Sequence, residues 1–267
     1  MVSRLDVLFT IYIKFLLLSC LQWLMAHPKF LKNQLYLAGD SYSGKIVPMI
    51  AQEISEGLDA GIEPILNLKG YMLGNPVTDE NKDINSRIQF SYLKALITHE
   101  IYESAKINCK GDYMNVDPSN GLCKADLQNV TTCTQNLYLA NILEPDCSIY
   151  ASPKPKLLNW HRSIFMEQDF SHFLLSPTRP PTPWCRGTIK DWARCNRTLS
   201  YTKDISSSLN YHRNLIKRGY RVLIYSGDLD MAIPYVGTET WIKSLNLTTD
   251  SGWQPWSVEG QVAGLVN

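Results

Sequence analysis

The feature that most constrains the fold is the stretch YLAGDSYSGKIVP at residues 36–48, in which serines separate two apolar segments. Residues 35–38 form an apolar run bounded by Asn33 and Gly39, which favours a buried strand. After Gly44 the apolar residues recur at helical spacing, and we expect the helix to stop near Gly57. A serine therefore lies on a predicted strand-to-helix turn.

The rest of the chain extends this pattern to an α/β fold. Residues 65–73 read as a second strand that ends at a Gly-Asn-Pro turn signal. Strand, helix and strand in this order imply parallel strands joined by a right-handed crossover. Near the carboxyl terminus, a helix at 206–218, a strand at 221–225 and a helix at 236–245 return the chain to the same architecture.

Between these segments the composition changes. Helical stretches such as 90–107 give way to cysteines, prolines and aromatic residues without β alternation. We interpret this part as a mostly helical, disulfide-containing insertion. The expected organisation is a core at residues 1–87, the insertion at 88–204 and the second part of the core at 205–267.

Cysteines and glycosylation sequons favour a secretory compartment. Six of the seven cysteines fall between residues 109 and 195, a cluster dense enough for a disulfide-stapled region. N-x-Thr sequons begin at Asn129, Asn196 and Asn246. Together these features favour secretion or the vacuolar route over the cytosol.

Charge and motif content exclude several classes of function. The formal net charge of +1 gives no reason to expect a nucleic acid or an anionic membrane as a partner. The chain has no CxxC, HExxH or closely spaced His/Cys cluster, so we expect neither a metal nor another cofactor. Residues 5–26 are apolar enough for a signal peptide, but interrupting polar residues favour an amphipathic helix at 22–31. We expect no stable membrane insertion.

Ser41 is the candidate nucleophile. The sequence Gly39-Asp-Ser-Tyr-Ser-Gly44 departs from the strict G-x-S-x-G elbow because Ser43 occupies the second glycine position. Small residues let the backbone turn sharply and expose the Ser41 hydroxyl at the end of the strand. The amide of Tyr42 can then donate to a developing oxyanion. The alternative is a Gly/Ser-rich turn without a catalytic role.

A carboxylate follows the late strand, in the segment YSGDLDMAIP. A carboxylate in this place can orient a histidine and stabilise its imidazolium form. Of the two aspartates we choose Asp230, and we expect Asp228 to hydrogen-bond the turn. The alternative is that both only form the turn, as aspartates often do.

Seven blocks of sequence resemble, in order, those of plant serine carboxypeptidase-like proteins. They are YLAGDSYSGKIVP, LKGYMLGNPVTD, NVDPSNGLC, ILEPDC, WARCN, YSGDLDMAIPYVGTETWI and WSVEGQVAG, and with their surroundings they extend from about Gln22 to Gly264. The resemblance implies an α/β-hydrolase fold with a Ser–Asp–His triad that enters the secretory pathway. Some members release C-terminal residues from peptides, and others transfer acyl groups from glucose esters to small acceptors.

The resemblance also implies roles for individual residues. Ser41 is then the nucleophile and Asp230 the triad acid. Asp40 occupies the position at which hydrolytic members carry a glutamate that helps to hold the substrate's terminal carboxylate, and aspartate there is more typical of the acyltransferase branch. One substitution leaves the choice between peptide and acyl-glucose substrates open.

The same resemblance implies two disulfides. They join Cys109 to Cys123 and Cys147 to Cys185. Cys195 has lost an N-terminal partner, and the remaining cysteines are unassigned; these are Cys20 and Cys133.

The departures from the family concern the base and the early strands. All five histidines precede Asp230, whereas the triad order in this fold is serine, acid and histidine. Among them His212, in a predicted helix, is interpreted as a surface or packing residue. Only about forty residues precede Ser41, so we expect a truncated or alternatively spliced chain with a sheet of three or four strands. The alternative function is a non-catalytic remnant or a binding module.

Overall fold

The computed structural model describes most of the chain, namely residues 7–144, 201–202, 204–248 and 251–267. The chain divides into two compact units, residues 1–149 with 201–267 and residues 150–200. The second unit lies outside the described residues, so the architecture below is that of the first unit.

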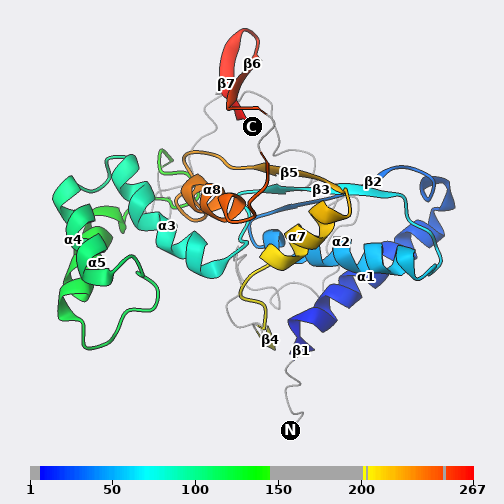
Figure 1. Ribbon diagram of the computed structural model, residues 1–267, viewed down its shortest axis with the longest axis horizontal. Helices are drawn as coiled ribbons and strands as arrows, with labels where there is room; N and C mark the ends of the chain where they lie inside the picture. The colour runs from blue at the N-terminus through cyan, green and yellow to red at the C-terminus, as the bar shows by residue number, and fades with distance from the viewer. Residues whose placement is uncertain (1–6, 145–200, 203, 249–250) are drawn as a thin grey trace, which may run out of the picture. The chain divides into compact units, whose positions relative to one another are not determined.

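Three parallel strands form the central sheet (Figure 1). They are β2 (Leu35–Asp40), β3 (Leu68–Gly74) and β5 (Arg221–Tyr225), in the order β2-β3-β5. The last residue of β2 lies opposite the last residue of β3, which in turn lies opposite the last residue of β5. The carboxyl ends of the three strands are therefore level, and the expected α/β fold with a parallel sheet is confirmed.

Helix α2 (Ser43–Asp59) returns the chain from β2 to β3. The predicted stop at Gly57 is wrong, because the glycine that ends the helix is Gly61, with φ 67°. The Ile62 amide donates to the Gly57 carbonyl at 2.9 Å, and the Gly61 amide donates to the Leu58 carbonyl at 3.1 Å. These two bonds form a Schellman motif, which satisfies the last carbonyls of the helix.

A proline inside α2 leaves one carbonyl for a tertiary contact. Pro48 has no N–H, so it cannot donate to the carbonyl of Gly44 one turn earlier. The buried hydroxyl of Ser208 donates to that carbonyl instead, at 2.9 Å. Ser208 also binds the segment after β3, since its amide donates to the Thr78 carbonyl at 2.8 Å. The start of α2 is thus tied to residues distant in sequence.

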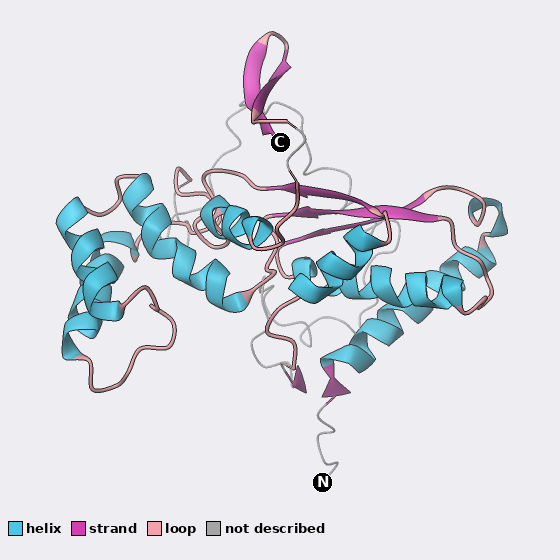
Figure 2. Cartoon of the chain, in the orientation of Figure 1, coloured by secondary structure: helices cyan, strands magenta, loops and turns pink. Residues whose placement is uncertain are grey.

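Helices α1 (Phe9–Ala26), α2 and α7 (Leu209–Lys217) cover one face of the sheet (Figure 2), and a hydrophobic core cluster lies between them and the strands. Alternate strand residues point towards these helices. Tyr71 and Leu73 of β3 are almost completely buried there, and partly buried strand residues pack around them; these are Leu35, Leu37, Val222 and Ile224. The opposite face carries more exposed apolar residues, notably Leu223 and Tyr225.

The first half of the expected insertion is helical. It contains α3 (Glu80–Leu93), α4 (His99–Cys109) and α5 (Gly121–Thr134). The helical stretch expected at 90–107 is not continuous, because Ala95 adopts φ 55° and Thr98 caps a new helix by accepting the Ile101 amide. Helix α3 runs across the expected boundary at residues 87 and 88, and the three-part division stays a prediction.

A disulfide joins the end of α4 to α5. It connects Cys109 to Cys123, the pair that the family resemblance implies. Cys20 and Cys133 are exposed free thiols. The expected Cys147–Cys185 bond and Cys195 lie outside the described residues.

Other elements flank the sheet. Helix α8 (Tyr235–Lys243) follows the loop after β5, and β1 (Val7–Leu8) pairs in parallel with β4 (Tyr201–Thr202). The sequence analysis did not predict the antiparallel hairpin of β6 (Gln254–Val258) and β7 (Gln261–Val266). Its turn, Glu259-Gly260, has positive φ at both residues, as two-residue hairpins prefer.

The helix expected at 22–31 is misplaced, because the N-terminal helix covers residues 9–26. Helix α1 ends at Ala26, and a 3₁₀ turn, η1 (Pro28–Phe30), follows it. A proline just after a helix is common, because proline cannot continue the i→i−4 hydrogen bonds. Within the residues that the structure describes, no helix is long and apolar enough to cross a membrane.

Candidate active site

Ser41 lies between β2 and α2 in a left-handed backbone conformation, with φ 57°. This conformation is costly for a residue other than glycine and holds the side chain at the sharp turn. The turn is fixed from both sides, because the Ser41 amide donates to the Gly74 carbonyl and its carbonyl accepts the Val77 amide, both at 2.9 Å. Ser41 is exposed, as a nucleophile elbow requires.

Two glycines make this turn sterically possible. A Cβ atom at Gly39 would collide with the side chain of Ser43, which follows the turn. A Cβ atom at Gly44 would lie 2.5 Å from Cβ of Pro76 and 2.6 Å from the carbonyl oxygen of Val77. Gly44, rather than the residue at position 43, therefore allows α2 to approach the end of β3.

Asp230 lies in the loop between β5 and α8, at the same edge of the sheet as Ser41. Its Oδ1 accepts the Ile233 amide at 2.9 Å. Burial raises the pKa of the Asp230 carboxyl, and the negative charge of Asp40 acts in the same direction. Hydrogen bonds from the Ile233 and Ala232 amides lower this pKa, as does the positive charge of Arg87.

The expectation for Asp228 is wrong. Its Oδ2 accepts a hydrogen bond from Lys94 Nζ at 2.8 Å instead of bonding the turn. Asp230 makes the hydrogen bond within the turn, by accepting the Ile233 amide. Asp228 is exposed, because it points away from the loop interior towards the lysine just after α3.

Asp40 and Tyr42 flank the serine. Asp40 is the last residue of β2, and its charge acts on both Asp230 and the Tyr225 hydroxyl, whose pKa is raised by burial and then by Asp40. Tyr42 immediately precedes the first turn of α2. Its amide is therefore next to the positive end of the helix dipole, where negative charge is stabilised.

Side chains that sequence reasoning missed fasten the loop that carries Asp230. Asn75, after β3, binds Ser226 Oγ, the Gly227 amide and the Ile233 carbonyl, each at 3.1 Å. Arg87 donates to the Ala232 carbonyl through Nε at 3.0 Å and Nη2 at 2.6 Å. The Gly-Asn-Pro turn signal gave the place of Asn75 but not its partners.

The structure brings no histidine to Ser41 through any hydrogen bond among the described residues. His212 is completely buried, and its Nδ1 lies 2.7 Å from the hydroxyl oxygen of Tyr71. Burial lowers the pKa of His212 to about 4. Of the two expectations for His212, the packing role is confirmed and the surface position is wrong. Its Nδ1 is paired with Tyr71 in the core and not with Ser41.

Two of the three sequons fall in the described residues. Asn129 is exposed on α5, and Asn246 is exposed in the turn after α8. Asn196 lies outside the described part.

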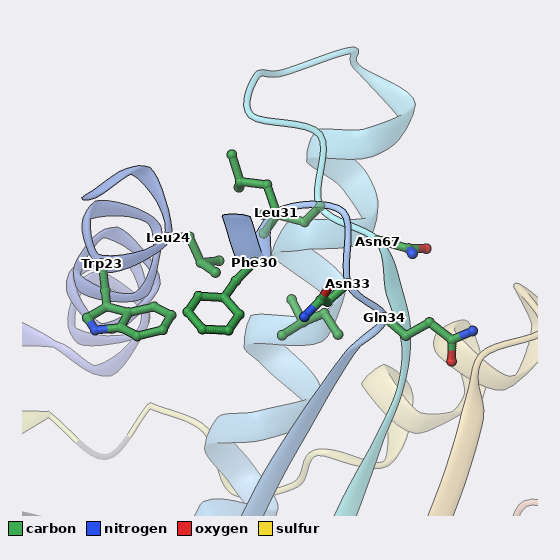
Figure 3. A pocket seen from close by; sticks show the side chains of 9 residues that line it. Trp23, Leu24, Phe30, Leu31, Asn33, Gln34 and Asn67 are labelled. Carbon is green, nitrogen blue, oxygen red and sulfur yellow. The ribbon is translucent and has the colours of Figure 1, made fainter. Parts of the chain in front are cut away.

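A small pocket opens at the other edge of the sheet (Figure 3). It has a volume of about 230 Å³ and is lined mainly by α1, η1 and the residues that lead into β2 and β3. Trp23 and Phe30 stack on one side with ring centroids 5.4 Å apart. The pocket includes neither Ser41 nor Asp230, which lie at the carboxyl ends of the strands. Among the described residues, no group of three or more His, Cys, Asp or Glu side chains could hold a metal ion.

A serine on a strained turn between a parallel strand and a helix, with an acid after a later strand, defines an α/β-hydrolase. The structure of "KEX1(DELTA)P, a prohormone-processing carboxypeptidase" from Saccharomyces cerevisiae has the same fold, with a TM-score of 0.58 at 18% identity. The match covers 91% of this chain and 56% of that one.

The chain belongs to the serine carboxypeptidase family, which it matches over residues 14–267. Serine carboxypeptidase-like 17 of Arabidopsis thaliana is 43% identical over 243 residues, and serine carboxypeptidase-like 11 of the same plant is 45% identical over 244. Each match covers 91% of this chain and 54% of the relative. The chain thus spans about half the length of the curated relatives it matches.

Proposed function

We propose that this chain carries the nucleophile and the acid of a serine-type acyl-transfer enzyme, in the roles of Ser41 and Asp230. The observation that carries the proposal is the positive φ of Ser41 on the turn between β2 and α2. Such strain is found at functional sites, where the surrounding structure has to hold it in place. Here the Gly74 carbonyl and the Val77 amide hold it.

In the proposed reaction the Ser41 oxygen attacks the acyl carbon of the substrate, and the carbonyl oxygen becomes an oxyanion. The Tyr42 amide donates to this oxyanion at the N-terminal end of α2. The hydroxyl proton passes to a histidine, which Asp230 orients and stabilises as imidazolium. The proposal assigns two members of the triad, Ser41 and Asp230; among the described residues Asp230 is hydrogen-bonded to the Ile233 amide and not to a histidine.

The substrate class follows from the same family. Hydrolytic substrates are peptides that lose their C-terminal residue to water, and transfer substrates are acyl-glucose esters that react with a small acceptor alcohol. Asp40 beside the serine supports the transfer branch, because its side chain is one methylene shorter than the glutamate of the hydrolytic members. The charge of Asp40 contributes to raising the pKa of Asp230, which supports a place for Asp40 near the proposed reacting centre.

A non-catalytic role is the second candidate. The burial of His212 supports it, because this histidine is paired with Tyr71 in the core and not with Ser41. In this case the 267 residues bind a ligand or a partner without turnover.

The proposed route of the protein is secretory, to the outside or to the vacuole. The Cys109–Cys123 disulfide and the exposed Asn129 and Asn246 support it. A chain expressed through a eukaryotic secretory pathway should lose mass on enzymatic deglycosylation. The double variant Asn129→Gln/Asn246→Gln should lose less mass, because Asn196 is its remaining sequon. Secreted chain with no mass change would contradict this route.

Chemical rescue tests the catalytic proposal. The 267-residue chain is incubated with p-nitrophenyl acetate, with and without a high concentration of imidazole, which can act as a general base in solution and takes the place of a histidine. We expect acetyl transfer to Ser41 that depends on imidazole and is absent in Ser41→Ala. Ser43→Ala is the matched control and should be acetylated like the wild type. Equal acetylation of the Ser41→Ala variant would refute the nucleophile.

A further inference from the structure

Asn75 connects the ends of all three strands. It directly follows β3 and adopts φ 35°, a conformation that asparagine tolerates better than most residues. The backbone amide of Asn75 donates to the carbonyl of Tyr225 at the end of β5, at 2.9 Å. Two residues close to Asn75 in the chain hold the main chain of Ser41 at the end of β2. The Gly74 carbonyl accepts the Ser41 amide, and the Val77 amide donates to the Ser41 carbonyl.

The side chain of Asn75 binds both ends of the loop that carries Asp230. Its Nδ2 donates to Ser226 Oγ and to the Ile233 carbonyl, and its Oδ1 accepts the Gly227 amide, each at 3.1 Å. Asp230 lies between these anchors and accepts the Ile233 amide. One amide side chain therefore closes the loop of residues 226–233 at its two ends.

Few side chains can make this set of contacts. An amide offers two N–H donors and one carbonyl acceptor, and asparagine carries them on a stem short enough for a tight turn. Aspartate keeps the acceptor but loses both donors, and glycine keeps the backbone conformation but loses every side-chain contact. These two replacements separate the role of the side chain from that of the turn.

We propose that Asn75 is a positioning residue that holds the Asp230 loop at a fixed place relative to the Ser41 turn. The consequence for catalysis rests on the proposed function. Other contacts also hold this loop, since Arg87 binds the Ala232 carbonyl near its second end. In its middle the Ile142 amide donates to the Leu229 carbonyl and the Met231 amide donates to the Leu139 carbonyl, so loss of the Asn75 side chain loosens the loop without detaching it.

Amide hydrogen exchange of the full chain tests the positioning. In Asn75→Gly we expect the Gly227 amide to exchange on the order of tenfold faster, because it loses its hydrogen bond to Asn75 Oδ1, worth about 1 kcal/mol. The Ile233 amide is bonded to Asp230, and we expect it to exchange faster because the Ile233 carbonyl loses its anchor to Asn75 Nδ2. In Asn75→Asp the Gly227 amide should remain protected while the Ile233 amide exchanges faster. Unchanged exchange in Asn75→Gly would overturn the proposal, as would an equal acceleration at the core residue Leu73, which would report general destabilisation.

Asn85→Ala is the matched control. Asn85 also makes side-chain contacts in both directions, but to Asn81, Asp112 and the Tyr113 amide, at the side of α3 away from the loop. Its replacement should leave the Gly227 and Ile233 amides unchanged. Faster exchange of both amides in this variant would overturn the specific role of Asn75.

The imidazole-dependent acetylation of Ser41 separates this proposal from the proposed function. We expect Asn75→Gly to slow it by about tenfold and to move its pH profile, since the environment of Asp230 changes, whereas Asn85→Ala should do neither. An unchanged rate and profile in Asn75→Gly would overturn the positioning role even if Ser41 is the nucleophile. If wild-type chain is not acetylated at all, the proposed function fails, and the exchange of Gly227 and Ile233 alone decides whether Asn75 holds the loop.

Discussion

The two faces of the three-stranded sheet differ in how completely they are covered. On one face Tyr71 and Leu73 are 1% and 0% exposed, because α1, α2 and α7 pack over them. On the other face Leu223 and Tyr225 of β5 are 53% and 46% exposed. Parallel sheets are usually covered on both faces. The difference shows that the core cluster against the sheet lies on the helix-covered face, while the candidate site lies at the carboxyl edge.

Truncation of one leucine on each face gives the largest expected contrast. Leu73→Ala removes a fully buried side chain from the helix-covered face and should lower the free energy of unfolding by about 3 kcal/mol. Leu223→Ala, on the opposite face of the neighbouring strand, should lower it by less than about 1 kcal/mol. Urea unfolding of the two variants measures both values. Equal losses would mean that the open face contributes as much as the covered one.

Acid should weaken the covered face through His212. Burial lowers its pKa from 6.5 to about 4, so the folded state favours the neutral imidazole. Its contribution is fully present above pH 6.5 and is lost as the pH falls towards 4, by up to about 3 kcal/mol. We expect the free energy of unfolding of the wild type to fall relative to that of His212→Gln across this range, because glutamine cannot be protonated.

The comparison with a variant is necessary because Asp83 acts in the opposite direction. Burial raises the pKa of Asp83 to about 7, so its protonated form is favoured in the folded state, and stability is lost as the pH rises from about 4 to 7. Asp83→Asn is the control, and it should remove this loss without changing the difference between wild type and His212→Gln. A wild-type curve parallel to that of His212→Gln would contradict the role of His212.

Changes on the open face should affect solubility more than stability. Leu223→Thr introduces a β-branched residue, which strands favour, and removes exposed apolar surface, so we expect a change of less than about 0.5 kcal/mol in the free energy of unfolding. The concentration at which the chain precipitates should rise, because an exposed apolar strand at a sheet edge favours association. Unchanged precipitation, or a loss of several kcal/mol, would mean that this face is covered in solution.

The sequence predicted those parts of the fold that depend on local patterns. The bounds of β5 were predicted correctly because an apolar run lies between Gly219 and the Ser-Gly turn, and the serine turn was predicted from its small residues. The end of α2 was misplaced because two glycines follow the helix pattern closely, and only tertiary packing and the Schellman bonds select the second. The hairpin at the carboxyl terminus was overlooked although Glu259-Gly260 lies between apolar residues.

The site was less accessible to sequence reasoning than the fold. Asn75 and its partners are about 150 residues apart in the chain, so no local spacing connects them. Asp228 and Asp230 are the same residue type two positions apart in one loop, so the sequence does not distinguish their roles. Only the position of Lys94 after α3 explains why Asp228 turns outward. The burial of His212 likewise depends on contacts of α7 with β3 and with Trp241 of α8.

The central proposal is that Ser41 and Asp230, which lie at the same edge of the sheet, act as nucleophile and acid, and that no histidine among the described residues serves Ser41 as a base. A serine hydroxyl without a base is a weak nucleophile, and loss of one triad member lowers turnover by as much as about 10⁶-fold in a serine protease. The most direct measurement is the intact mass of the 267-residue chain after incubation with a fluorophosphonate probe in the absence of imidazole. We expect no adduct on Ser41, and no difference between the wild type and Ser41→Ala. A stoichiometric adduct on Ser41 that disappears in Asp230→Asn would contradict the claim, because it would mean that a histidine within these residues serves as the base.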